Sequence, residues 1–146
     1  MKARFSVSVF RRSDDIVVVP QNGGGGLYFS VEPIHRISPT LDDLTRAIEE
    51  AAATSDLTVR DVNLRDYKSP VPRAVGLKSN RKFDDSVRAH CSVLRWDADI
   101  EIVLWRRAPD GRGFEPTDRT VTLPPSATAA DIAQAAIQLM SDGAAS

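Results

Sequence analysis

Cysteine, net charge and long apolar runs are all scarce in this sequence of 146 residues. The single cysteine, Cys91, excludes an intramolecular disulfide framework and suits a reducing compartment. The formal net charge is −1, so no global basic field draws the chain to phosphate backbones, and direct nucleic-acid binding is not expected. No window reaches the apolar length of a membrane span, and residues 1–15 lack the apolar core of a signal peptide. These absences predict a soluble cytoplasmic protein with no membrane partner.

Metal ligands are equally scarce, because only two histidines accompany the one cysteine. Structural zinc requires clustered Cys and His ligands, and these three residues have no recognised spacing. We therefore expect no metal and no cofactor. Cys91 is expected to face the core as a small apolar residue.

What the sequence does contain is typical of a globular protein, with 42% hydrophobic and 27% charged residues. Its length predicts a single domain over residues 1–146, with the last few residues frayed. Alternating apolar positions predict a strand at 4–10, and a β-branched run predicts a second strand at 16–19, joined to the first in a hairpin and ended by Pro20. A second hairpin is predicted from 89–96 and 100–106, followed by a strand at 119–123.

Two principal helices are predicted, around residues 40–53 and 128–141, each with an apolar stripe and a hydroxyl residue at its start. Ser79 is expected to cap a further single turn. A weak alternation suggests a strand at 58–64, and the prolines of 66–73 predict a loop. The predicted class is α+β: a mainly antiparallel sheet of about six or seven strands, with a meander in the C-terminal half and the two helices packed on it.

The run QNGGGG at residues 21–26 invites a phosphate-binding interpretation, because bare backbone N–H groups can wrap an anion. Nucleotide-binding loops lead into a helix, whereas these glycines lead into the strand-like LYFSVEP. A flexible connection between strands is the favoured interpretation.

His35 and His90 are candidates for the acid and base of a metal-independent ribonuclease, with Lys78 stabilising a charged transition state. Nothing in the sequence brings them together. The ordinary alternative for both is a partly exposed histidine on a strand.

Three pairs of adjacent aspartates lie at 14–15, 42–43 and 84–85. Side-by-side acids on a helix point about 100° apart, so they do not converge on one metal or one scissile bond. They serve solubility and helix N-termini, or they meet a basic protein. Trp96 and Trp105 anchor either a core or an interface.

Several short elements follow one another along the sequence: VVVPQNGGGGLYFSVEPI, the helix start at Ser38-Pro39, GLKS followed by Phe83, the Asp97-Ala98-Asp99 turn, Gly113-Phe114-Glu115, Leu123-Pro124 and the Ala-rich last helix. Together they resemble the immunity proteins of contact-dependent growth inhibition (CDI) systems, the CdiI family. The likeness spans roughly Val17 to Met140, and the chain departs from the family pattern at Asn80, where a bulky aromatic residue is expected.

The resemblance implies a non-enzymatic cytoplasmic protein that binds the cognate C-terminal toxin domain of a large exported effector, commonly a nuclease, in a 1:1 complex. As a hypothesis, exposed residues near the best-matched elements contribute to the toxin contact: Lys78, Asp84, Asp85, Asp97 and Asp99. The alternatives left open are the small ribonuclease using His35 and His90, and a structural or adaptor protein with no toxin partner.

Overall fold

The computed structural model describes residues 3–24, 27–58 and 67–144 of the chain. Within these ranges seven strands form one sheet in which every pairing is antiparallel, so the predicted α+β class is confirmed. The elements along the chain are β1 (Ala3–Arg11), β2 (Ile16–Gly24), β3 (Leu27–Ser30), β4 (His35–Ile37), α1 (Leu41–Thr54), α2 (Val71–Ala74), α3 (Asn80–Ser86), β5 (Ala89–Trp96), β6 (Ile100–Arg107), β7 (Phe114–Leu123) and α4 (Ala129–Ala144).

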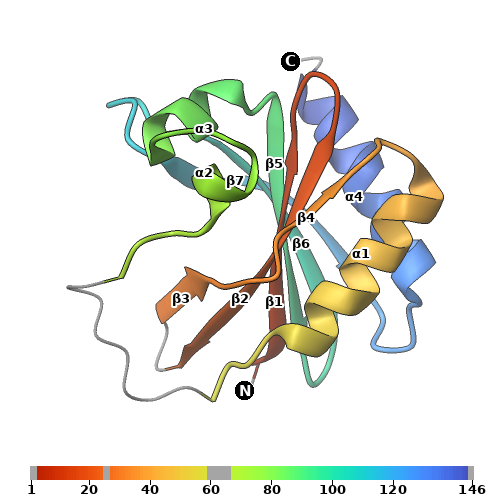
Figure 1. Ribbon diagram of the computed structural model, residues 1–146. Helices are drawn as coiled ribbons and strands as arrows, with labels where there is room; N and C mark the ends of the chain where they lie inside the picture. The colour runs from red at the N-terminus through yellow and green to blue at the C-terminus, as the bar shows by residue number, and fades with distance from the viewer. Residues whose placement is uncertain (1–2, 25–26, 59–66, 145–146) are drawn as a thin grey trace.

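Strands from the N-terminal and C-terminal halves of the chain lie in the same sheet. Its order is β3-β2-β1-β5-β6-β7, with β4 also paired to β2. The N-terminal hairpin and the C-terminal meander therefore meet where β1 pairs with β5, for example Val7 opposite Val93. Figure 1 shows α1 and α4 on one side of this sheet and α2 and α3 on the other.

The first face of the sheet carries the larger core, because its strands place apolar residues at every second position. Leu44 and Ile48 of α1, and Ile132 and Leu139 of α4, pack on that face. The strand residues buried there are Val7, Val9, Ile16, Val18, Cys91, Val93, Ile100, Ile102 and Leu104. The predicted alternation at 4–10 and 100–106 and the predicted burial of Cys91 are confirmed.

Both principal helices begin at a hydroxyl residue. Thr40 Oγ1 accepts a hydrogen bond from the Asp43 backbone N–H at 3.3 Å. At the start of α4, Asp131 N–H donates to Thr128 Oγ1 at 3.2 Å, and Thr128 N–H donates to Asp131 Oδ2 at 3.0 Å. This reciprocal pair satisfies free backbone groups at the helix start and fixes where the helix begins.

The second face carries a smaller core under α2 and α3. Phe10 and Val17 from the sheet contact Val71 of α2 and Phe83 of α3. Ser79 caps α3 as predicted, accepting the Lys82 N–H at 3.2 Å. The short helix α2 was not predicted, since it lies in the segment assigned to a loop.

Two predictions near the glycine run were wrong: that the strand ends at Pro20, and that residues 21–24 belong to a flexible connection. Strand β2 does not end at Pro20 but continues through residues 21–24 to Gly24, where Gln21 and Gly23 pair with β3. The Pro20 carbonyl accepts the Val31 N–H at 3.0 Å, so its nitrogen faces the same outer edge, between β3 and β4. A missing N–H is tolerated there because no ladder bond is lost. The strand predicted at 58–64 falls almost wholly on residues 59–66, outside the described residues.

The buried helix α1 offers a matched test of the core. Leu44 is 0% exposed, whereas Leu41, one turn earlier, is 42% exposed. We expect Leu44→Ala to lower the free energy of unfolding by about 3 kcal/mol, because a buried leucine leaves a cavity when truncated. The same change at Leu41 should cost less than about 0.5 kcal/mol. Urea unfolding of both variants checks this, and equal losses would contradict the assigned packing.

Candidate functional site

The five residues predicted to contact a toxin fall into two groups that the fold keeps apart. Lys78 is exposed just before α3, and Asp84 and Asp85 lie on α3, which leads into the start of β5. Asp97 and Asp99 lie in the turn after the end of β5. Eight strand residues span roughly 26 Å, so no single small site contains both groups.

The two aspartates of α3 differ in their surroundings. Asp85 forms an ion pair with Arg107 at 2.8 Å and is largely exposed. Asp84 is half-buried, and loss of solvent raises the pKa of its carboxyl. The neighbouring Arg107 opposes that pKa shift, and Asp85 adds to it.

The turn after β5 is held by contacts within the protein. Arg4 Nε lies 2.6 Å from Asp97 Oδ1. The Trp96 N–H donates to the Asp99 carbonyl at 2.8 Å, which closes the hairpin. The Asp97 side chain and the Asp99 backbone therefore have structural roles, and contact with a toxin stays a prediction for all five residues.

The two histidines do not form an acid–base pair. His35 lies opposite Val18 and pairs with Glu50 of α1 at 3.4 Å, so it faces the α1–α4 side of the sheet. His90 lies opposite Phe10 and Trp105, on the other face. The sheet separates the two rings, so they cannot act together on one substrate.

His90 is a core residue, not the partly exposed histidine expected from the sequence. It is 7% exposed, and neither ring nitrogen has a hydrogen-bond partner within the described residues. Its ring stacks on Phe10 at 4.0 Å between centroids and meets Phe114 edge-on at 4.9 Å. Burial lowers the pKa of His90 to about 3, so the imidazole is neutral at physiological pH.

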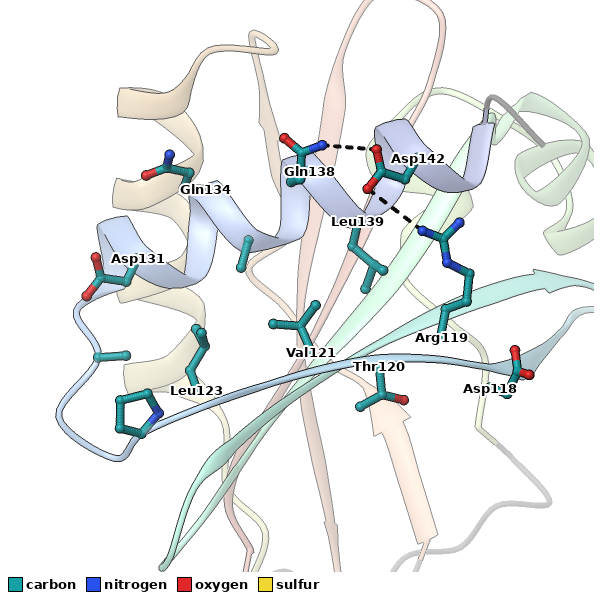
Figure 2. A pocket seen from close by; sticks show the side chains of 13 residues that line it. Asp118, Arg119, Thr120, Val121, Leu123, Asp131, Gln134, Gln138, Leu139 and Asp142 are labelled. Atoms are coloured by element: carbon teal, nitrogen blue, oxygen red, sulfur yellow. Dashed lines mark hydrogen bonds and ion pairs between the residues drawn. The ribbon is translucent and has the colours of Figure 1, made fainter.

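One surface groove lies between β7 and α4 and has a volume of 780 Å³. Figure 2 shows Val121, Leu123 and Leu139 lining it, with polar side chains along its rim. Asp142 accepts a hydrogen bond from Gln138 at 2.9 Å and lies 3.7 Å from Arg119, while Asp131 belongs to the α4 cap. These two acidic groups of the groove thus already have partners within the protein.

A second hollow of 540 Å³ opens on the opposite face, between β3, α3 and the start of β7. Aromatic rings dominate its lining, which includes the carboxylate-bearing Asp84. The ring of Phe29 packs against Tyr67 at 5.6 Å, and the Tyr67 hydroxyl donates to the Ser30 carbonyl at 2.6 Å. The six aromatic residues that line it are Phe10, Tyr28, Phe29, Tyr67, Phe83 and Phe114.

A basic groove of 610 Å³ adjoins this aromatic hollow. Lys68, Arg73 and Lys78 line it, and none of the lining residues is acidic. The two hollows share Tyr67, Ser69 and Asn80. We call the aromatic hollow and the basic groove together the α2–α3 surface. Of the five predicted residues it includes Lys78 and Asp84.

Sequence reasoning missed this surface although part of its signal is local. The span from Tyr67 to Phe83 contains five cationic residues and no Asp or Glu, namely Lys68, Arg73, Lys78, Arg81 and Lys82. The net charge of −1 conceals this cluster, because it averages over the whole chain. The aromatic half could not be found in the same way, since its rings come from segments far apart in the sequence.

Two absences hold for the described part of the chain. Over residues 3–24, 27–58 and 67–144, no group of three or more His, Cys, Asp or Glu side chains is arranged to hold a metal ion. No helix in those same ranges is long and apolar enough to cross a membrane.

Comparisons with known proteins give evidence on the fold. No protein-family model and no curated protein matches the sequence. A protein of unknown function from Neisseria meningitidis has a similar structure, with a TM-score of 0.75, 14% identity and 94% of each chain covered. A chain of the CdiA-CT/CdiI toxin and immunity complex from Yersinia pseudotuberculosis is also similar, with a TM-score of 0.72, 16% identity and 97% of each chain covered. At such identities the likeness establishes a shared fold.

The buried His90 predicts a pH dependence of stability. Its pKa is about 3 in the folded protein and has its ordinary value of 6.5 in the unfolded chain, which therefore binds this proton first as the pH falls. The free energy of unfolding should drop as the pH decreases from 6.5 toward 3, by about 2 kcal/mol between pH 7 and pH 5 from this residue alone. In His90→Phe that component should vanish.

The measurement is urea unfolding of wild type and His90→Phe at pH 7 and pH 5. Subtracting the free energies of unfolding of the two proteins at each pH removes the contribution of the carboxyl groups that both contain. If the difference in free energy of unfolding between wild type and His90→Phe is the same at both pH values, a neutral, buried His90 is contradicted.

Proposed function

We propose that this protein is an immunity protein that binds and neutralises the cognate C-terminal toxin domain of a CDI effector. One observation carries the proposal: the fold matches a chain of a toxin and immunity complex over 97% of both chains. The independent likeness of short sequence elements to the CdiI family points to the same role. We further propose that the toxin is a nuclease, that the complex is 1:1 and that it forms in the cytoplasm.

The physical basis of such protection is occlusion. A bound protein that covers the toxin's substrate cleft excludes substrate without any chemistry of its own. A standard interface buries about 800 Å² on each partner, and aromatic residues at its centre slow dissociation. The α2–α3 surface supplies both a concave shape and aromatic side chains, of which Tyr28 is 43% exposed.

The geometry gives no support to the ribonuclease alternative. His35 and His90 lie on opposite faces of the sheet, and His90 is buried with its pKa lowered to about 3. A histidine held neutral by burial and unable to reach solvent is poorly placed to exchange protons with a substrate.

Co-purification with the toxin domain encoded immediately upstream tests the proposal. We expect a stable 1:1 complex by size-exclusion chromatography with light scattering, and toxin activity that falls to zero at one equivalent of this protein. An unrelated CDI toxin domain serves as the specificity control. Absence of binding at micromolar concentrations would sink the proposal and favour an adaptor role.

A separate assay addresses catalysis. We expect total RNA to remain intact after incubation with the purified wild-type protein, and His35→Ala and His90→Ala to behave identically to it. RNA cleavage that either substitution abolishes would establish the ribonuclease instead.

A further inference from the structure

We infer that the basic groove of the α2–α3 surface binds an acidic segment of the partner protein, so that this surface is where the toxin docks. The inference rests on the proposed function, because the partner is taken to be the toxin domain. It specifies the chemistry of the contact: carboxylates in the basic groove and an adjoining apolar or aromatic side chain in the aromatic hollow.

The charge distribution is the first argument. Lys68, Arg73 and Lys78 line one groove with no acidic residue among the lining. All three side chains are exposed, and none forms an ion pair within residues 3–24, 27–58 and 67–144. Like charges gathered at one place repel each other, so an anionic partner relieves a cost that the free protein carries.

Arginines elsewhere in the fold show the contrast. Arg36 contacts Asp15 at 2.7 Å, Arg106 contacts Glu115 at 2.7 Å, and Arg107 contacts Asp85 at 2.8 Å. These three strand arginines are thus each paired with an acidic residue from a neighbouring segment. In the basic groove, no acidic residue in the described part of the chain forms an ion pair with Lys68, Arg73 or Lys78, so these side chains can pair with acids of a partner.

The shape of the surface is the second argument. The basic groove and the aromatic hollow share Tyr67, Ser69 and Asn80, so a ligand in one borders the other. Their volumes of 610 and 540 Å³ are each sufficient for one or more side chains. A protein segment with acidic residues next to a large apolar residue would fill both, with charge guiding encounter and the apolar anchor slowing release.

A protein segment fits this surface better than RNA does. The whole chain has a net charge of −1, which gives no long-range attraction for a polyanion. Asp84 lines the aromatic hollow itself, where it would repel the phosphates flanking a stacked base. A short acidic segment can avoid that carboxylate by placing an uncharged side chain beside it.

The test compares two charge-reversed variants that change the net charge equally. The groove variant is Lys68→Glu with Lys78→Glu. Both residues lie outside helices and strands, which limits any effect on folding. The control variant is Arg46→Glu with Arg119→Glu, at exposed positions on α1 and in the β7–α4 groove. Thermal unfolding confirms that each variant is folded.

Binding of the upstream toxin domain is measured by surface plasmon resonance at 50 and 500 mM NaCl. We expect the groove variant to bind about 30-fold more weakly than wild type at 50 mM, mainly through slower association, and the gap to narrow at 500 mM as salt screens the charges. The control variant should stay within about threefold of wild type.

The outcomes separate the two proposals. If the groove variant binds the toxin as tightly as wild type does, the docking site is wrong and the immunity role stands. The same conclusion follows if only the control variant loses binding. No binding by wild type removes both. A labelled single-stranded RNA 12-mer that binds wild type at 150 mM NaCl, competes with the toxin and fails to bind the groove variant would assign the surface to RNA instead.

Discussion

The pairing of β1 with β5 is the interaction on which the rest of the fold depends. Local turns are enough to form the N-terminal hairpin and the C-terminal meander, but each alone would leave an open edge and an uncovered apolar face. Placing Val7 beside Val93 and Val9 beside Cys91 joins them into one sheet with a continuous apolar face. That face is wide enough for two long helices side by side, and α1 and α4 both pack on it and on each other.

The connection between β2 and β5 then determines what covers the other face. This connection contributes α1 to the first face. For the second face its described part contributes α2, with four residues, and α3, with seven. Helices this short bury Val71 and Phe83 but cannot cover the whole sheet. The aromatic hollow lies at the edge of this partial cover, lined by side chains from the sheet and the connecting segment. The hollows of the α2–α3 surface thus arise because the helices cover the second face less completely than the first.

Features set by neighbouring residues were predictable from the sequence, and features set by assembly were not. Alternation located β5 and β6, and the hydroxyls of Thr40, Ser79 and Thr128 marked helix starts, because both signals act within a few residues. The prediction that Pro20 ends its strand was wrong because the missing N–H matters only if that side of β2 has a ladder partner at Pro20. The positions of β3 and β4 decide this, and they are not evident from the local sequence. The burial of His90 likewise required knowledge of what covers the second face.

The same distinction explains why the acidic residues singled out from the sequence do not form one site. Asp97 and Asp85 are each neutralised by an arginine of the protein itself, so they stabilise a turn and a helix contact. The cations of the α2–α3 surface lack such partners among the described residues, and the Debye length of about 10 Å at 0.1 M salt confines their influence to their own surroundings. A net charge near zero therefore does not exclude a locally basic surface, and the charge that favours a partner differs from one groove to another. If a toxin domain docks at the α2–α3 surface as proposed, the segment that enters the basic groove is acidic, whatever the net charge of the toxin as a whole.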